Sequence, residues 1–162
     1  MADEKFEFRK MRRFKQQLER EECEAILDEA RRGTLAVMGE GGYPYAIPMN
    51  FVREGDKLYF HSAREGHKID AITACDKASF ATHDDGVREE GQWWYVVRSV
   101  ICFGRIRQVE DPTEIERILW LFGDKNSPNA DYTAHEIEKD GPRVAILELA
   151  IEHMTGKTVN ER

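Results

Sequence analysis

The feature of this sequence that most constrains its fold is a change of hydrophobic period at Gly33. Before it, four apolar residues recur at helical spacing among charged ones: Cys23, Ile26, Leu27 and Ala30. They predict an amphipathic helix over about residues 20–32 that ends at Gly33. After Gly33 the apolar residues come in short runs separated by turns that contain glycine. Such runs predict antiparallel strands, so the chain should be mainly β.

The strands that we expect are 34–39, 43–52, 57–61, 77–83, 93–109 and 144–151. The first three should form a β-meander, because only Glu40-Gly41-Gly42 and Glu54-Gly55-Asp56 separate them. Gly104 should mark a bend or bulge in the long run 93–109, whose length suits a strand that curls around a barrel.

Helical patterns are few and lie between strands. A short helix should begin near Gly66 and continue to about residue 75, and a longer one should span residues 112–123. Asp111 and Pro112 provide the N-cap and the first helical position of the longer helix. Residues 133–139 should form one or two turns. No regular alternation of strands and helices occurs, so the sequence predicts an α+β fold, an antiparallel β-barrel with peripheral helices.

Length and composition narrow the class of protein. The 162 residues fit one domain, with the first 15 or so as an arm. A net charge of −7 would repel a nucleic-acid backbone, and 34% charged residues disfavour a membrane span. Three cysteines, Cys23, Cys75 and Cys102, form no C-x-x-C pair. We therefore expect a cytoplasmic protein with neither a disulfide framework nor a zinc ribbon.

The most informative stretch for chemistry is residues 59–68, where a strand leads through Gly66 into a helix. A helix N-terminus presents free backbone N–H groups, and Ser62, His67 and Lys68 can add donors there. This arrangement is typical of a phosphate site. These residue types at a strand end are more often solvated surface residues, and that interpretation stays open from the residues alone.

Other candidates give weaker signals. His61 and His67, with Asp70 nearby, lack the spacing of a metal site, and neither a G-x-S-x-G element nor an ATP-binding P-loop is present. The aromatic run 93–95 could stack on a ligand, but packing in a core or a dimer interface is the commoner role. Arg98 should either pair with a carboxylate or, with Ser99, contact an anion or a flavin.

Four stretches together carry a family resemblance: 43–51 (YPYAIPMNF), 59–71 (YFHSAREGHKIDA), 98–105 (RSVICFGR) and 151–157 (IEHMTGK). In this order they resemble the pyridoxamine 5′-phosphate oxidase-like FMN-binding proteins, and within them the nitroimidazole-resistance (NimA-like) branch. The resemblance extends over residues 11–157. The strongly basic clusters and the C-terminal substrate signature of the oxidases themselves are missing, so pyridoxamine phosphate oxidation is not expected.

The resemblance implies a split β-barrel that forms a homodimer with two FMN sites at its interface. It assigns Ile47, Pro48, Met49 and Asn50 to the isoalloxazine ring, and His61 and Ser62 to the flavin and ribityl region. It assigns His67 and Lys68 to the phosphate, and Arg98 and Ser99 to a contact from the long strand.

Two functional classes follow from the resemblance. One is an FMN-dependent reductase of small aromatic or nitro compounds, supplied with electrons by transiently bound NAD(P)H or by a partner reductase. In it His61 would be the catalytic proton donor, although a hydrogen bond to the flavin or a neighbouring strand would explain His61 equally well. The other is a flavin carrier or redox sensor, or a relative that holds haem through a histidine.

Overall fold

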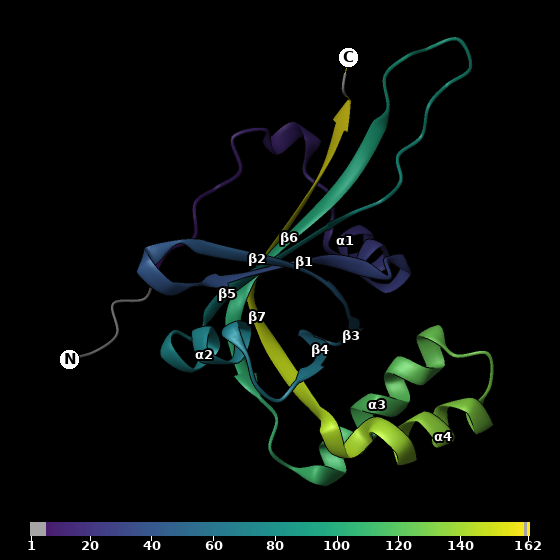
Figure 1. Cartoon of the computed structure of the whole chain (residues 1–162). Helices are drawn as coiled ribbons and strands as arrows, with labels where there is room; N and C mark the ends of the chain where they lie inside the picture. The colour runs from purple at the N-terminus through teal and green to yellow at the C-terminus, as the bar shows by residue number, and fades with distance from the viewer. Residues whose placement is uncertain (1–5, 161) are drawn as a thin grey trace.

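The computed structural model describes residues 6–160 and residue 162, which form one curled antiparallel sheet with four α-helices (Figure 1). The sheet order is β2-β1-β5-β6-β7-β4-β3. The strands are β1 (Arg32–Met38), β2 (Pro44–Asn50), β3 (Val52–Glu54), β4 (Lys57–Ala63), β5 (Lys77–His83), β6 (Val96–Gln108) and β7 (Val144–Asn160). This is the split barrel that the sequence predicted.

The expected β-meander is wrong in one respect. β1 pairs with β2 and β3 pairs with β4, as the glycine turns require, but these two hairpins lie at opposite ends of the sheet order. Phe51 alone joins β2 to β3, where one continuous strand was expected. The reason is long-range pairing: β1 takes β5 as its second partner and β4 takes β7.

The helices are α1 (Arg20–Glu29), α2 (His67–Ala74), α3 (Pro112–Asn126) and α4 (Ala130–Asp140), with 3-10 turns at Phe14–Gln16, Glu40–Gly42 and Gly141–Arg143. The helices at Gly66 and Asp111 begin as predicted, and the Asp111 side chain accepts a hydrogen bond from the Thr113 N–H. α4 is longer than the one or two turns expected. None of the helices that the model describes is both long enough and apolar enough to cross a membrane.

Gly33 does not end α1, contrary to expectation. The helix ends at Glu29, and the Lys125 ammonium binds its C-terminal carbonyls at Ala30 (2.6 Å) and Leu27 (3.4 Å). Gly33 lies within β1, where a β-carbon would overlap the ring of Phe80. The glycine is therefore required for close packing between strands.

β6 and β7 form the longest pair of the sheet, from Val96 opposite Asn160 to Gln108 opposite Leu147. β7 continues nine residues beyond its expected end at residue 151. At the predicted bulge, Phe103 pairs with His153 but Gly104 pairs with Ile151, so the extra residue is on β7. The free end of this ribbon projects from the barrel (Figure 1).

Two hydrophobic clusters hold the fold together. The larger fills the barrel with inward residues of the strands, among them Leu35, Phe60 and Leu147, and α1 and α2 add buried residues to it. The smaller lies outside the barrel, between the outer face of β3, β4 and the first half of β7 and the helix α3.

Candidate functional site

The outer surface of the sheet has two parts that differ in cover. Under α3, outward residues such as Tyr59 and Ile146 are at most 1% exposed. On the other part, formed by β2, β1, β5, β6 and the second half of β7, the outward residues are exposed or partly exposed to solvent. Two rows of paired residues cross this part: Pro48–Thr34–Ala81–Ile101 and Ala46–Ala36–Ser79–Phe103. We call it the open face.

The structure brings Ser62 and Lys68 together where β4 leads into α2. Lys68 Nζ donates a hydrogen bond to Ser62 Oγ (3.0 Å), which in turn donates to the Ala63 carbonyl (2.9 Å). Gly66 precedes the helix with φ +120°, and a β-carbon there would meet nothing within 4 Å. The ammonium of Lys68 and the first amides of the helix thus lie beside an open approach, an arrangement that can bind a phosphate, and the buried Ser62 hydroxyl positions Lys68.

His67 joins this cluster to the edge of the sheet. Its ring stacks on Tyr45 of β2, with centroids 4.1 Å apart and an angle of 16° between planes. The start of α2 is therefore fixed beside β2, the strand that carries the predicted ring contacts.

The residues Ile47 to Asn50 alternate across β2. Met49 is buried in the barrel, Pro48 is exposed on the open face, and Asn50 Oδ1 accepts a hydrogen bond from Arg32 Nε (2.8 Å). Within the described chain β2 pairs only with β1, so its second edge offers unpaired backbone groups. Such an edge can meet the polar rim of a planar ligand.

His61 lies on the opposite side of β4 from Ser62. Its ring packs edge-on against Phe122 of α3, with centroids 5.0 Å apart. Desolvation lowers the pKa of His61, and the charge of Lys68 lowers it further. The imidazole lies on the α3 side of the sheet but, unlike Tyr59 and Ile146, it is exposed to solvent.

Arg98 and Ser99, predicted as a pair, point to different sides of β6. Arg98 Nε donates to Asp84 Oδ2 (2.8 Å), and the Arg98 backbone N–H donates to Asp84 Oδ1 (2.9 Å). Although burial alone would raise the pKa of Asp84, these hydrogen bonds hold it below its usual value. The carboxylate partner for Arg98 is therefore present. Ser99 faces the open face.

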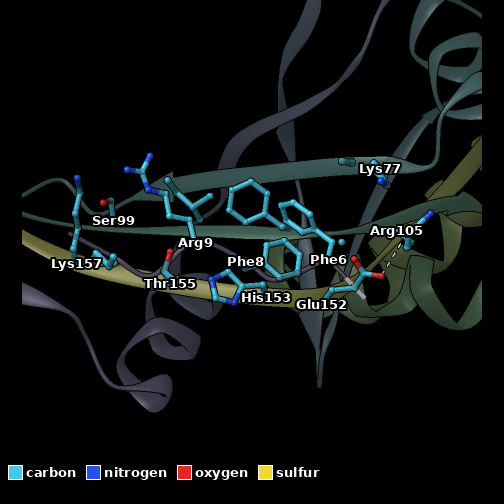
Figure 2. A pocket seen from close by; sticks show the side chains of 15 residues that line it. Phe6, Phe8, Arg9, Lys77, Ser99, Arg105, Glu152, His153, Thr155 and Lys157 are labelled. Atoms are coloured by element: carbon cyan, nitrogen blue, oxygen red, sulfur yellow. Dashed lines mark hydrogen bonds and ion pairs between the residues drawn. The ribbon is translucent and has the colours of Figure 1, made fainter. Parts of the chain in front are cut away.

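A groove of about 1060 Å³ runs along the open face at β6 and β7 (Figure 2). Residues 6–11, which we call the N-terminal strap, form one wall. The opposite wall includes Ser99, Ile101, Phe103, His153 and Lys157. Sequence reasoning missed this groove, because its walls come from the first residues and from the unexpected half of β7. The sequence feature that could have indicated this groove is the alternation of outward residues at 99, 101 and 103.

Two other candidates can be placed. Among residues 6–160 and 162, no three His, Cys, Asp or Glu side chains gather as metal ligands would. The aromatic run 93–95 precedes β6 in a loop, and Trp93 is 75% exposed, so packing in the core is wrong for Trp93.

Comparison with known proteins gives one family and many similar folds. A family model described as pyridoxamine 5′-phosphate oxidase matches residues 19–158. No curated protein matches the sequence.

Three solved structures illustrate the likeness of fold. A candidate 5-nitroimidazole antibiotic resistance protein from Bacteroides thetaiotaomicron is 22% identical with a TM-score of 0.74, covering 89% of this chain and 87% of its own. An FAD-binding protein from Mesorhizobium loti is 23% identical with a TM-score of 0.64, covering 88% and 96%. An FAD and haem binding protein from Mycobacterium smegmatis is 22% identical with a TM-score of 0.71, covering 91% and 74%.

Proposed function

The chain belongs to the pyridoxamine 5′-phosphate oxidase family, and on this premise we propose that it is a flavoprotein that binds FMN. The observation that carries the proposal is the cluster of Ser62, His67 and Lys68 at the start of α2. It supplies a charged donor, held by the Ser62 hydroxyl, and helix amides beside an open approach, and those groups fit a phosphate monoester. Two solved structures of similar fold are described as FAD-binding, which supports a flavin in general.

In this proposal the chain's residues hold the flavin by its two ends. Lys68 and the first amides of α2 bind the phosphate, and Ser62 lies toward the ribityl region, whereas His61 faces the other side of β4. The free backbone edge at Ile47–Asn50 meets the polar rim of the ring, and Ser99 approaches from β6. Arg98, held by Asp84, would orient the strand end rather than serve as a free cation.

We propose that the flavin ring lies between two copies of the chain. The open face leaves Ile101 and Phe103 each 39% exposed in the centre of a sheet, and exposed apolar surface of this kind marks contact sites. A closed two-fold pair is the commonest oligomer, and it would cover the second side of the ring.

The proposed activity is reduction of small aromatic or nitro compounds. A bound flavin would supply the redox chemistry, and the protein would orient the acceptor and exclude water. The electron donor would be NAD(P)H or a partner reductase, bound transiently. His61 would hold the proton that the reduced acceptor needs. The fold likeness to a candidate nitroimidazole resistance protein supports this acceptor class.

A cytoplasmic location belongs to the same proposal. Cys23, Cys75 and Cys102 are free thiols, as a reducing compartment permits.

The visible absorbance spectrum of the purified protein tests the cofactor. We expect the two bands of an oxidised flavin, and chromatography of the released cofactor should identify FMN. A Soret band would instead support a haem protein, and a colourless protein that does not take up added FMN would contradict the proposal. Consumption of NAD(P)H with a nitroaromatic acceptor then separates a reductase from a flavin carrier.

A further inference from the structure

The N-terminal strap (residues 6–11) lies along the open face and is attached to it by aromatic contacts (Figure 2). The ring of Phe8 stacks on His153, with centroids 4.6 Å apart and an angle of 5°, and it lies 5.6 Å from the ring of Phe103. Phe6 packs edge-on against Phe8. Phe8 is therefore the anchor of the strap.

Hydrogen bonds between the N-terminal segment and the sheet begin only after the strap. Residues 6–12 form no hydrogen bond with any other residue that the structure describes. In contrast, Gln17 forms a β-bridge with Lys157, and the Leu18 N–H donates to the Gly156 carbonyl (2.9 Å). The strap is thus tethered beside the groove at one end and held along its length by side-chain stacking.

The strap covers the face incompletely. With the strap in place, Ile101 and Phe103 remain 39% exposed and Phe6 remains 72% exposed. A groove of about 1060 Å³ is left between strap and sheet. Native protein interiors pack densely, so the open face and the strap are not complementary surfaces. Among the described residues, those that line this groove together with the strap come from β5, β6 and β7, and none comes from β1 or β2.

We propose that the strap is an internal competitor for the open face: it lies on the face in the single chain and leaves it when a second copy pairs there. This inference rests on the proposed dimer. A stacked aromatic pair contributes little free energy, so a complementary surface can displace it. Each pairing must displace two straps, and the strap therefore weakens dimerisation.

The test is the dimer dissociation constant of the flavin-loaded protein with Phe8→Ala. We expect the variant to dimerise about 10- to 100-fold more tightly than the wild type, because two stacking contacts need no longer be broken. Sedimentation of a fluorescently labelled chain from nanomolar to micromolar concentration measures it. Phe14→Ala is the matched control, since Phe14 is an exposed aromatic (69%) outside the groove, and it should leave the constant unchanged.

Trypsin cleavage after Arg9 and Lys10 gives an independent measurement. If the strap is released on pairing, the rate of cleavage per chain should rise as the concentration passes through the dimer dissociation constant. Unchanged or weaker dimerisation of Phe8→Ala, or protection of these bonds in the dimer, would overturn the inference while leaving the dimer in place. A flavin-loaded chain that stays monomeric in every form would overturn the proposed dimer and the inference together.

Discussion

The two outer parts of the sheet differ in what their apolar side chains meet, although β7 contributes to both. Beneath α3, Tyr59 and Ile146 are at most 1% exposed and pack with Ile118 and Phe122. On the open face, Ile101 and Phe103 are each 39% exposed, and Phe8 of the strap is the nearest ring. Burial on one side stabilises the fold, and the other side is left exposed.

His61 is the residue that challenges this division most directly. It packs against Phe122 on the α3 side, yet it is exposed to solvent and we propose that it donates a proton. In flavin-loaded protein, His61→Ala should keep its colour and dimer state but reduce a nitro acceptor about 10²- to 10⁴-fold more slowly. Steady-state kinetics with NAD(P)H measures this loss.

The pH dependence of the reduction rate gives a second test of the proton-donor role of His61. Desolvation, helped by the charge of Lys68, lowers the pKa of His61, so the protonated donor becomes the minor form at a pH below the usual value of about 6.5. The rate should therefore fall as pH rises through a value below 6.5, and His61→Ala should lose this dependence. Full activity in the flavin-loaded variant would leave His61 a structural role and make the covered side wholly structural.

Ile118 tests the stabilising side of the comparison. It is 0% exposed beneath the covered part of the sheet, so Ile118→Ala should lower the free energy of unfolding by about 2–5 kcal/mol through lost burial and a cavity. Ile101→Ala is the matched substitution on the open face. It should cost less than about 1.5 kcal/mol in the monomer, because that side chain is already partly solvated. Urea denaturation at concentrations below the dimer range measures both. Equal losses would mean that the open face is part of the core.

The sequence predicted the local features well because local physics decides them. Three features depend only on residues that are neighbours in the sequence. They are the hairpin glycines, the helix that begins at Asp111 and Pro112, and the strand at residues 77–83. The bulge near Gly104 could be predicted from the sequence for the same reason.

What failed depends on distant partners. The second half of β7, with Gly156 and polar residues at 152, 155 and 157, has a weak strand pattern, and pairing with β6 holds it in the sheet. The packing of Gly33 against Phe80, and the separation of the two hairpins, likewise follow from strand pairing that no local pattern reveals. The ion pair of Arg98 was one of two open alternatives, and only the fold could supply Asp84 as its partner.

The cluster of Ser62 and Lys68 could be predicted because its members are six residues apart across one turn. The contact of Tyr45 with this cluster could not be predicted, because the stack of Tyr45 on His67 depends on the place of β2 in the barrel. The predicted flavin residues thus gather in part: Ser62, His67 and Lys68 form one group near β2, whereas His61 and Arg98 point elsewhere.

We propose that Lys68 and the start of α2 hold the flavin phosphate, and the most direct test compares FMN with riboflavin, which lacks the phosphate. Fluorescence titration of flavin-free protein should show FMN bound more tightly than riboflavin. Lys68→Ala should weaken FMN binding about 10- to 100-fold, the loss of one charge-assisted hydrogen bond, while riboflavin binding stays nearly unchanged. Lys139→Ala on α4, remote from the cluster, is the control. A Lys68→Ala protein that keeps the wild-type ratio of FMN to riboflavin affinity would contradict the account.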